Sequence, residues 1–179
     1  MTANSTALDT QARPLGRSVA FSLVGALGIA AAAQVAIPVP GTPVPMTLQP
    51  LAVLVVGGIL GPRYGALSAL LYLAMGVAGL PVFTPGGLPG FSRLLGPTGG
   101  YLISYPFAAF AVGALRGHSL ARAWLAAAAG LAIILIAGTA QLAILSGTRV
   151  ALTLGFLPFV IKDLGSVLVA GLLVHRFKR

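Results

Sequence analysis

Two ionisable residues, Lys162 and Asp163, are adjacent inside an apolar run near the end of the chain. Ionisable groups in a membrane segment are costly, and most of them mark a ligand or ion pathway. The alternative is a mutual ion pair with only a structural role. Neighbouring residues of a helix point about 100° apart, which makes a direct pair geometrically poor. We therefore favour a binding role, with Pro158 as the first helical residue and Asp163 near the positive end of that helix.

Arg93 is a second candidate, and it lies in a long loop. The stretch 79–101 contains seven glycines and four prolines, which exclude a continuous helix. Its aromatic and leucine side chains argue against disorder, and long ordered loops are usually functional. Inside a pocket, Arg93 would hold a carboxylate in a forked geometry, whereas on the surface it would be an ordinary solvated residue. Both interpretations stay open.

Three further polar side chains are weaker candidates: Gln49, Tyr72 and Tyr101. Each could contact a ligand, or could simply lie at a membrane interface or between helices. His118 and His175 lie at expected cytoplasmic ends, so we expect no metal site and no cofactor. The sequence contains no P-loop, zinc-protease or Gly-x-Ser-x-Gly motif and no paired carboxylates within a span. A binding or transport protein is therefore expected rather than an enzyme.

The composition predicts which elements position these residues. Hydrophobic residues make up 58% of the 179 positions and charged residues only 7%, and the mean hydropathy is +1.00. Globular domains carry about 25% charged residues, so we expect an all-α integral membrane protein. The net charge of +9 forms no basic stripe, which argues against nucleic acid as a partner. Cysteine is absent, which excludes disulfides.

The chain divides into a tail and one membrane domain. Residues 1–17 are expected to form a flexible cytoplasmic tail, and residues 18–179 a single domain of six transmembrane helices. Pro- and Gly-rich outer loops would cap a pocket in this domain. The helices are expected at residues 18–37, 51–60, 64–80, 99–115, 123–145 and 154–174.

Basic residues predict the orientation of these helices. In the six-helix arrangement most arginines and lysines flank the ends on one side, while Arg93 and Arg149 lie on the other. The positive-inside rule then places both termini in the cytoplasm and the protein in the cytoplasmic (inner) membrane, embedded in the lipid bilayer.

The proline-rich segment 37–50 is predicted to be an extended connection on the outer side. The helix after it is too short to cross about 30 Å of hydrocarbon at 1.5 Å per residue. The segment is therefore expected to dip into the membrane and to border a cavity with Gln49 at its mouth.

Several sequence blocks in the same order carry a resemblance to a known family. They are VPMTLQ (44–49), LGPRYGALS (60–68), GLPVF (79–83), LGPTGGYL (95–102) and LPFVIKDLGSVLVAG (157–171). In these blocks the chain resembles the BioY family, the biotin-binding S components of energy-coupling factor (ECF) transporters. The resemblance implies high-affinity binding and uptake of biotin, together with a transmembrane coupling subunit and paired ABC-type ATPases. In the family the small-residue face of the first helix contacts the coupling subunit, which would give Ala26 and Ala30 a purpose.

The chemistry of biotin suggests roles for the candidate residues. Asp163 can accept the ureido N–H groups, Arg93 or Lys162 can hold the carboxylate, and aromatic side chains can line the apolar parts. The family commonly has a basic residue three positions after this aspartate, where this chain has Ser166, and Lys162 would take over that role. The family also often has a polar residue after the PVF block, which here is Thr84, and the partner of the ureido carbonyl stays open.

Other functions also remain open at this stage. The chain could be an S component for another small vitamin, which only ligand binding would distinguish. It could also be a membrane-embedded enzyme or a structural subunit, although neither catalytic residues nor a partner surface are visible in the sequence. Whether the chain forms homo-oligomers is likewise open.

Overall fold

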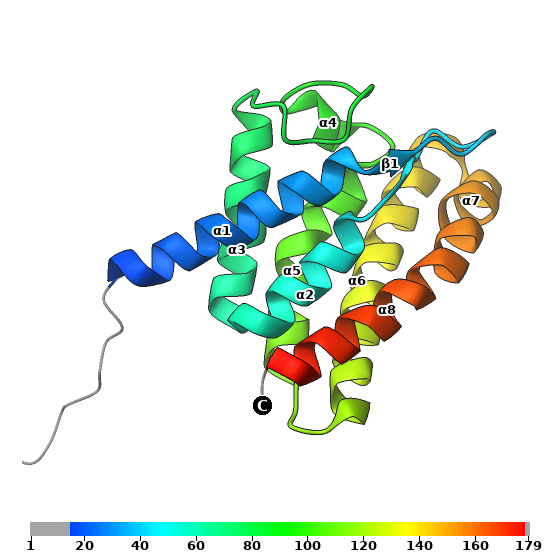
Figure 1. Cartoon of the computed structure of the whole chain (residues 1–179). Coiled ribbons are helices and arrows are strands. Elements are labelled where there is room, and N and C mark those ends of the chain that lie inside the picture. The colour runs from blue at the N-terminus through cyan, green and yellow to red at the C-terminus, as the bar shows by residue number, and fades with distance from the viewer. Residues whose placement is uncertain (1–14, 178–179) are drawn as a thin grey trace, which may run out of the picture.

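The computed structural model describes residues 15–177 and is mostly helical (Figure 1). The long helices are α1 (Leu15–Gln34), α2 (Gln49–Leu60), α3 (Pro62–Val77), α5 (Gly99–Leu115), α6 (Leu120–Ser146) and α8 (Leu157–Phe177). The short elements are β1 (Ala36–Ile37), β2 (Met46–Thr47), α4 (Ser92–Leu95), α7 (Thr148–Val150) and a π-helix (Ala151–Phe156). The predicted all-α fold is thus confirmed. Most of the predicted tail lies outside the described residues, but α1 already begins at Leu15.

Two described segments are long and apolar enough to cross a membrane, namely 120–146 and 148–177. Residues 18–34, α2 and α5 form shorter apolar helices. A count of six crossings therefore stays a prediction. The α4 loop and the β1–β2 pair lie at one end of the bundle, and the α5–α6 turn and the end of α8 lie at the other (Figure 1).

Close helix contacts in the bundle depend on small residues. A β-carbon on Gly57 of α2 would lie 2.4 Å from the carbonyl oxygen of Ala109 in α5. One on Gly138 of α6 would lie 2.1 Å from the ring of Tyr101 in α5. Because the hydrophobic effect does not drive helices together within lipid, close van der Waals packing at such small residues is one of the main sources of helix association. The helix α5 therefore packs directly against both α2 and α6.

The first helix differs from expectation at Ala26 and Ala30. Both are buried in the core of this chain, with exposed fractions of 0% and 9%. The exposed side of α1 carries large residues such as Val24 and Leu27 and also the small residues Gly28 and Ala31. The predicted role for the two alanines as a contact with a coupling subunit is therefore wrong, because the chain's own helices cover them.

The proline-rich segment folds back on itself instead of forming one extended connection. Strands β1 and β2 pair in antiparallel register, with Ala36 opposite Thr47 and Ile37 opposite Met46. The turn between them contains Gly41, whose φ of 83° suits glycine. The hairpin delivers the chain to α2, which begins at Gln49 rather than at the predicted residue 51.

Pro158 is not at the start of its helix, contrary to prediction. Residues 148–177 form one continuous helical segment, in which a π-helix ends directly before Leu157 and Pro158. A proline inside an α-helix removes a hydrogen bond and clashes with the preceding turn. In this segment the backbone departs from α-helical geometry in the wider π-helical turn before Pro158. Asp163 therefore lies well inside a helix, and the argument from a helix start does not apply to it.

Candidate functional site

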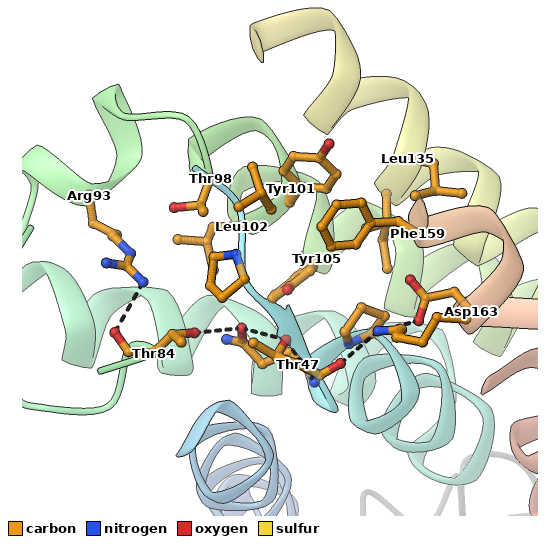
Figure 2. Close-up of a pocket in the computed structure, with 16 residues that line it drawn as sticks. Thr47, Thr84, Arg93, Thr98, Tyr101, Leu102, Tyr105, Leu135, Phe159 and Asp163 are labelled. Carbon is orange, nitrogen blue, oxygen red and sulfur yellow. Dashed lines mark hydrogen bonds and ion pairs between the residues drawn. The ribbon is translucent and has the colours of Figure 1, made fainter. Parts of the chain in front are cut away.

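A cavity opens among the helices beside the β1–β2 pair and α4 (Figure 2). Its walls come from the β2 region, α2, the loop after α3, the α4 segment, α5, α6 and α8. The lining residues are Val44, Pro45, Thr47, Gln49, Pro50, Thr84, Arg93, Thr98, Tyr101, Leu102, Tyr105, Ile134, Leu135, Phe159, Lys162 and Asp163. The predicted cavity beside the start of the second helix is present.

Lys162 and Asp163 form a direct ion pair, which corrects the sequence-based expectation. Lys162 Nζ lies 2.6 Å from Asp163 Oδ1 and donates to the carbonyl oxygen of Thr47 over 2.8 Å. The expectation that neighbouring helical residues cannot pair considered only the directions of their β-carbons. The long, flexible lysine side chain reaches around the helix to the carboxylate. Asp163 is 1% exposed and Lys162 26%, so the carboxylate is inside and the ammonium at the rim.

Ser166 also contacts Asp163, since its hydroxyl donates to Oδ1 over 3.1 Å. Within residues 15–177, the bonds from Lys162 and Ser166 thus both end on Oδ1. The second carboxylate oxygen, Oδ2, is the atom of this group with capacity left for a ligand.

Gln49 is the centre of a buried hydrogen-bond network. Its Oε1 accepts from Thr47 Oγ1 and from Thr84 Oγ1, each over 3.1 Å. Its Nε2 donates to the hydroxyl of Tyr72. These hydrogen bonds fix Gln49, Thr47 and Thr84 relative to one another.

Tyr72 does not line the cavity but lies behind Gln49. It is fully buried, and its ring packs edge-on against Phe83 with centroids 5.5 Å apart. Of the seven residues predicted to bind ligand, the structure brings Gln49, Thr84, Arg93, Tyr101, Lys162 and Asp163 to the cavity wall. Tyr72 supports that wall from the second layer, and ligand contact by the other six stays a prediction.

Arg93 is drawn into the interior, with an exposed fraction of 6%. One terminal nitrogen, Nη2, donates to the carbonyl oxygen of Thr84 over 3.0 Å. The buried Nε has no hydrogen-bond partner among the described residues. Burial lowers the pKa of this guanidinium. An arginine held this way, with a buried donor unused, is well prepared to receive an anion.

Aromatic and aliphatic side chains separate the two charged ends. Leu102, Tyr101, Tyr105 and Phe159 lie between Arg93 and Asp163 (Figure 2). The Tyr101 hydroxyl donates to the carbonyl oxygen of Gly155 over 2.7 Å, which ties the ring to the π-helix. The arrangement suits an elongated ligand with an anionic end, an apolar middle and a hydrogen-bond donor at the other end.

Outside the cavity is a wider hollow. The cavity itself has a volume of about 40 Å³, whereas the hollow between loops 38–45 and 85–98 has about 650 Å³. Pro45, Arg93 and Thr98 line both spaces. Arg93 therefore lies at the boundary between the hollow and the cavity.

Sequence comparison places this chain in a family. The model of the family described as "BioY family" matches residues 3–179, nearly the whole chain. The chain belongs to the BioY family.

Curated relatives agree with this assignment. The chain is 40% identical over 136 residues to the probable biotin transporter BioY of Pyrococcus horikoshii, covering 76% of this chain and 82% of the relative. It is also 40% identical over 146 residues to the biotin transporter BioY of Thermotoga maritima, covering 80% of this chain and 86% of the relative.

A solved structure has the same fold as this BioY-family chain. The crystal structure of the S-component for biotin from an ECF-type ABC transporter matches with a TM-score of 0.81 and 26% identity over 91% of each chain. The chain is thus a membrane protein with the S-component fold.

Sequence reasoning missed several cavity residues of this BioY-family protein. Thr47, Tyr105 and Phe159 line the cavity but were not singled out. Threonine and aromatic residues are ordinary in apolar helices and turns, so no spacing signal marks them. Only the resemblance in the VPMTLQ block could have pointed to Thr47. Within residues 15–177, no cluster of three or more His, Cys, Asp or Glu could hold a metal ion.

Proposed function

We propose that this protein binds biotin and mediates its uptake as the S component of an ECF-type transporter. The observation that carries the proposal is the match in fold, over 91% of both chains, to a solved S-component for biotin. The curated biotin transporters at 40% identity support the same function. The cavity's two charged ends and apolar middle fit the chemistry of this ligand.

In this proposal, Asp163 binds the ureido ring. The ring carries two N–H donors, and Oδ2 of Asp163 is the carboxylate oxygen with acceptor capacity left. A charge-assisted bond in a buried site is about twice as strong as a neutral one. The thiophane ring and the pentanoate chain would then lie along Tyr101, Tyr105 and Phe159.

Arg93 is the better of the two candidate cations for the biotin carboxylate. Lys162 is already paired with Asp163 and with the carbonyl oxygen of Thr47. Arg93 has an unused buried Nε and lies at the other end of the cavity, toward the outer hollow. The pentanoate would therefore point outward and the ureido ring inward.

Lys162 takes a different role in this proposal. The family commonly has a basic residue at the position of Ser166. In this chain Lys162, four residues earlier, neutralises Asp163 instead. Both Lys162 and Ser166 contact the same oxygen of Asp163. The lysine thus keeps the aspartate charged and oriented, and it closes the cavity by its bond to Thr47.

We further propose that the chain works with a transmembrane coupling subunit and ABC-type ATPases, and that it performs no catalysis of its own. Its orientation would be the one expected from the basic residues, in the cytoplasmic membrane with both termini in the cytoplasm. The cavity then opens to the outside, which suits a protein that captures a scarce solute.

Equilibrium binding of labelled biotin to the purified chain in detergent tests the central proposal. Saturable binding that unlabelled biotin displaces, and that riboflavin or thiamine does not, is the expected result. Displacement by another vitamin in preference to biotin would assign the cavity to that ligand instead. Uptake in cells with and without the ATPase subunits then tests the need for the partner proteins.

A further inference from the structure

Gln141 lies in α6, close to the short helix that carries Arg93. Its side-chain nitrogen Nε2 donates to the carbonyl oxygen of Leu94 over 2.8 Å and to that of Gly96 over 2.9 Å. A primary amide has two N–H groups, and here each has an acceptor. Gln141 therefore uses its full donor capacity on the segment that directly follows Arg93.

The packing around Gln141 leaves room for this contact and for little else. A β-carbon on Gly99 would lie 1.8 Å from the carbonyl oxygen of Leu94 and 2.5 Å from Gln141 Nε2. A β-carbon on Gly100 would lie 2.8 Å from the Gln141 β-carbon. Both glycines at the start of α5 thus allow α4, α5 and α6 to meet at the amide of Gln141.

Hydrophobic burial holds the α4 segment only weakly. Phe91 and Leu95 are 59% and 65% exposed, whereas Leu94 packs against the core. The polar ties of the segment are therefore important for its position. Within the described residues its side-chain hydrogen bonds to other elements are those from Gln141 on one side and the one from Arg93 to Thr84 on the other, beside the backbone bond from Gly99 N–H to the carbonyl oxygen of Gly96.

We propose that Gln141 is a positioning residue: its amide holds the α4 segment against α6 and so fixes the Arg93 guanidinium at the mouth of the cavity. The inference rests on the proposed function only where ligand affinity is the readout. Gln141 itself does not line the cavity, so its effect on ligand passes through Arg93.

The first test needs no ligand. Gln141→Met keeps the length and volume of the side chain but removes both donors. Hydrogen–deuterium exchange of the purified full chain should rise in residues 91–97 of the variant, with the helices α2 and α3 unchanged. Unchanged exchange in residues 91–97 would overturn the proposal, whether or not the chain binds biotin. If the methionine variant does not fold, Gln141→Asn, which is too short to reach both carbonyls, makes the same comparison.

The second test separates positioning from general stability. Gln141→Met should weaken biotin by about tenfold but biotin amide by less than about threefold, because only the acid depends on Arg93. In an Arg93→Ala background the same change should have no further effect. Equal losses for acid and amide, or additive losses in the double variant, would show a merely structural role and refute the proposal.

A glycine pair supplies an independent check. Gly99→Ala should push the Leu94 carbonyl away from Gln141 and reproduce the acid-selective loss. Gly165→Ala, at a helical position with no heavy atom within 4 Å of the added carbon, is the matched control and should leave both ligands unaffected. A Gly99→Ala variant with the affinities of the control would contradict the proposed role of the contact between Gln141 and the α4 segment. Absence of biotin binding by the unaltered chain would instead count against the proposed function, and the exchange experiment would still decide on Gln141.

Discussion

Gly87 lies directly against the guanidinium of Arg93. A β-carbon added to Gly87 would lie 0.8 Å from Arg93 Nη1 and 2.1 Å from Cζ. The end of a long side chain is easier to displace than the backbone, so the arginine would have to move. The glycine thus sets where the cation rests, without itself offering a side chain to a ligand.

Gly87→Ala is therefore expected to act like a partial loss of Arg93. Biotin affinity should fall several-fold as the guanidinium shifts, and the affinity for biotin amide should change little. Competition binding with the two ligands measures both. Gly28→Ala, where the added carbon meets nothing within 4 Å, is the control. An equal loss for acid and amide would mean that the loop, rather than the cation, has been disturbed.

Removal of each cation should distinguish their roles. With Arg93→Ala, biotin should weaken by more than about tenfold while biotin amide is nearly unaffected, since the amide tail offers no anion. With Lys162→Ala, both ligands should weaken, because the lysine acts on Asp163 at the ureido end. Acid-selective loss with Lys162→Ala would instead place the carboxylate at the lysine, and the double variant then shows by non-additivity whether both cations share it.

Asp163→Asn keeps the shape of the side chain and removes its charge. Biotin affinity should fall by more than about tenfold, the 1.4 kcal/mol scale of one charge-assisted bond. Isothermal titration of the purified variant measures the change. Ser166→Ala, which removes one donor to Oδ1 and leaves the carboxylate, should have a smaller effect. Unchanged affinity in Asp163→Asn would make the aspartate a purely structural partner of Lys162.

The orientation in the membrane can be tested in this cysteine-free chain. Leu88→Cys puts a single thiol in the loop between α3 and α4, and His118→Cys puts one in the α5–α6 turn. These two connections lie at opposite ends of the bundle (Figure 1). An impermeant maleimide should label only the first in intact cells, and both after permeabilisation. Labelling of both thiols in intact cells would refute the proposed topology.

Helix packing predicts a stability difference between two glycines. Gly57→Ala forces the α2 and α5 backbones apart and should cost about 1–3 kcal/mol of unfolding free energy, as overpacking does. Gly28→Ala has open space and should change stability by less than about 1 kcal/mol. Thermal unfolding in detergent measures both. A Gly57→Ala variant as stable as Gly28→Ala would show that the two helices can separate without cost.

The helices were predictable because each is a long apolar run with clear ends. The helix expected at 123–145 is observed at Leu120–Ser146, and the one expected at 99–115 is observed at Gly99–Leu115. The hairpin at 36–47 was missed, since closely spaced prolines suggest extended backbone and pairing of two-residue strands leaves no periodic signal. The π-helix before Pro158 was missed because the sequence shows the proline but not how the preceding turn accommodates it.

The candidate site was predictable where a residue is chemically unusual for its surroundings. Charged residues such as Arg93 and Asp163 are conspicuous in an apolar chain, and both line the cavity. Gln141 is also polar, but a single glutamine in a membrane helix has many ordinary explanations. The ion pair between Lys162 and Asp163 depends on the reach of a flexible side chain, which residue spacing does not encode.

The hydrogen bond from Lys162 to the carbonyl oxygen of Thr47 joins residues 115 positions apart. During synthesis the N-terminal helices emerge first, so the hairpin that carries Thr47 is made well before α8. The cavity wall formed by Phe159, Lys162 and Asp163 cannot exist until that last helix has been inserted. A nascent chain that stops short of α8 therefore has the β1–β2 hairpin and the loop with α4 but no complete cavity, and the capacity to bind ligand arises in the same step that finishes the bundle.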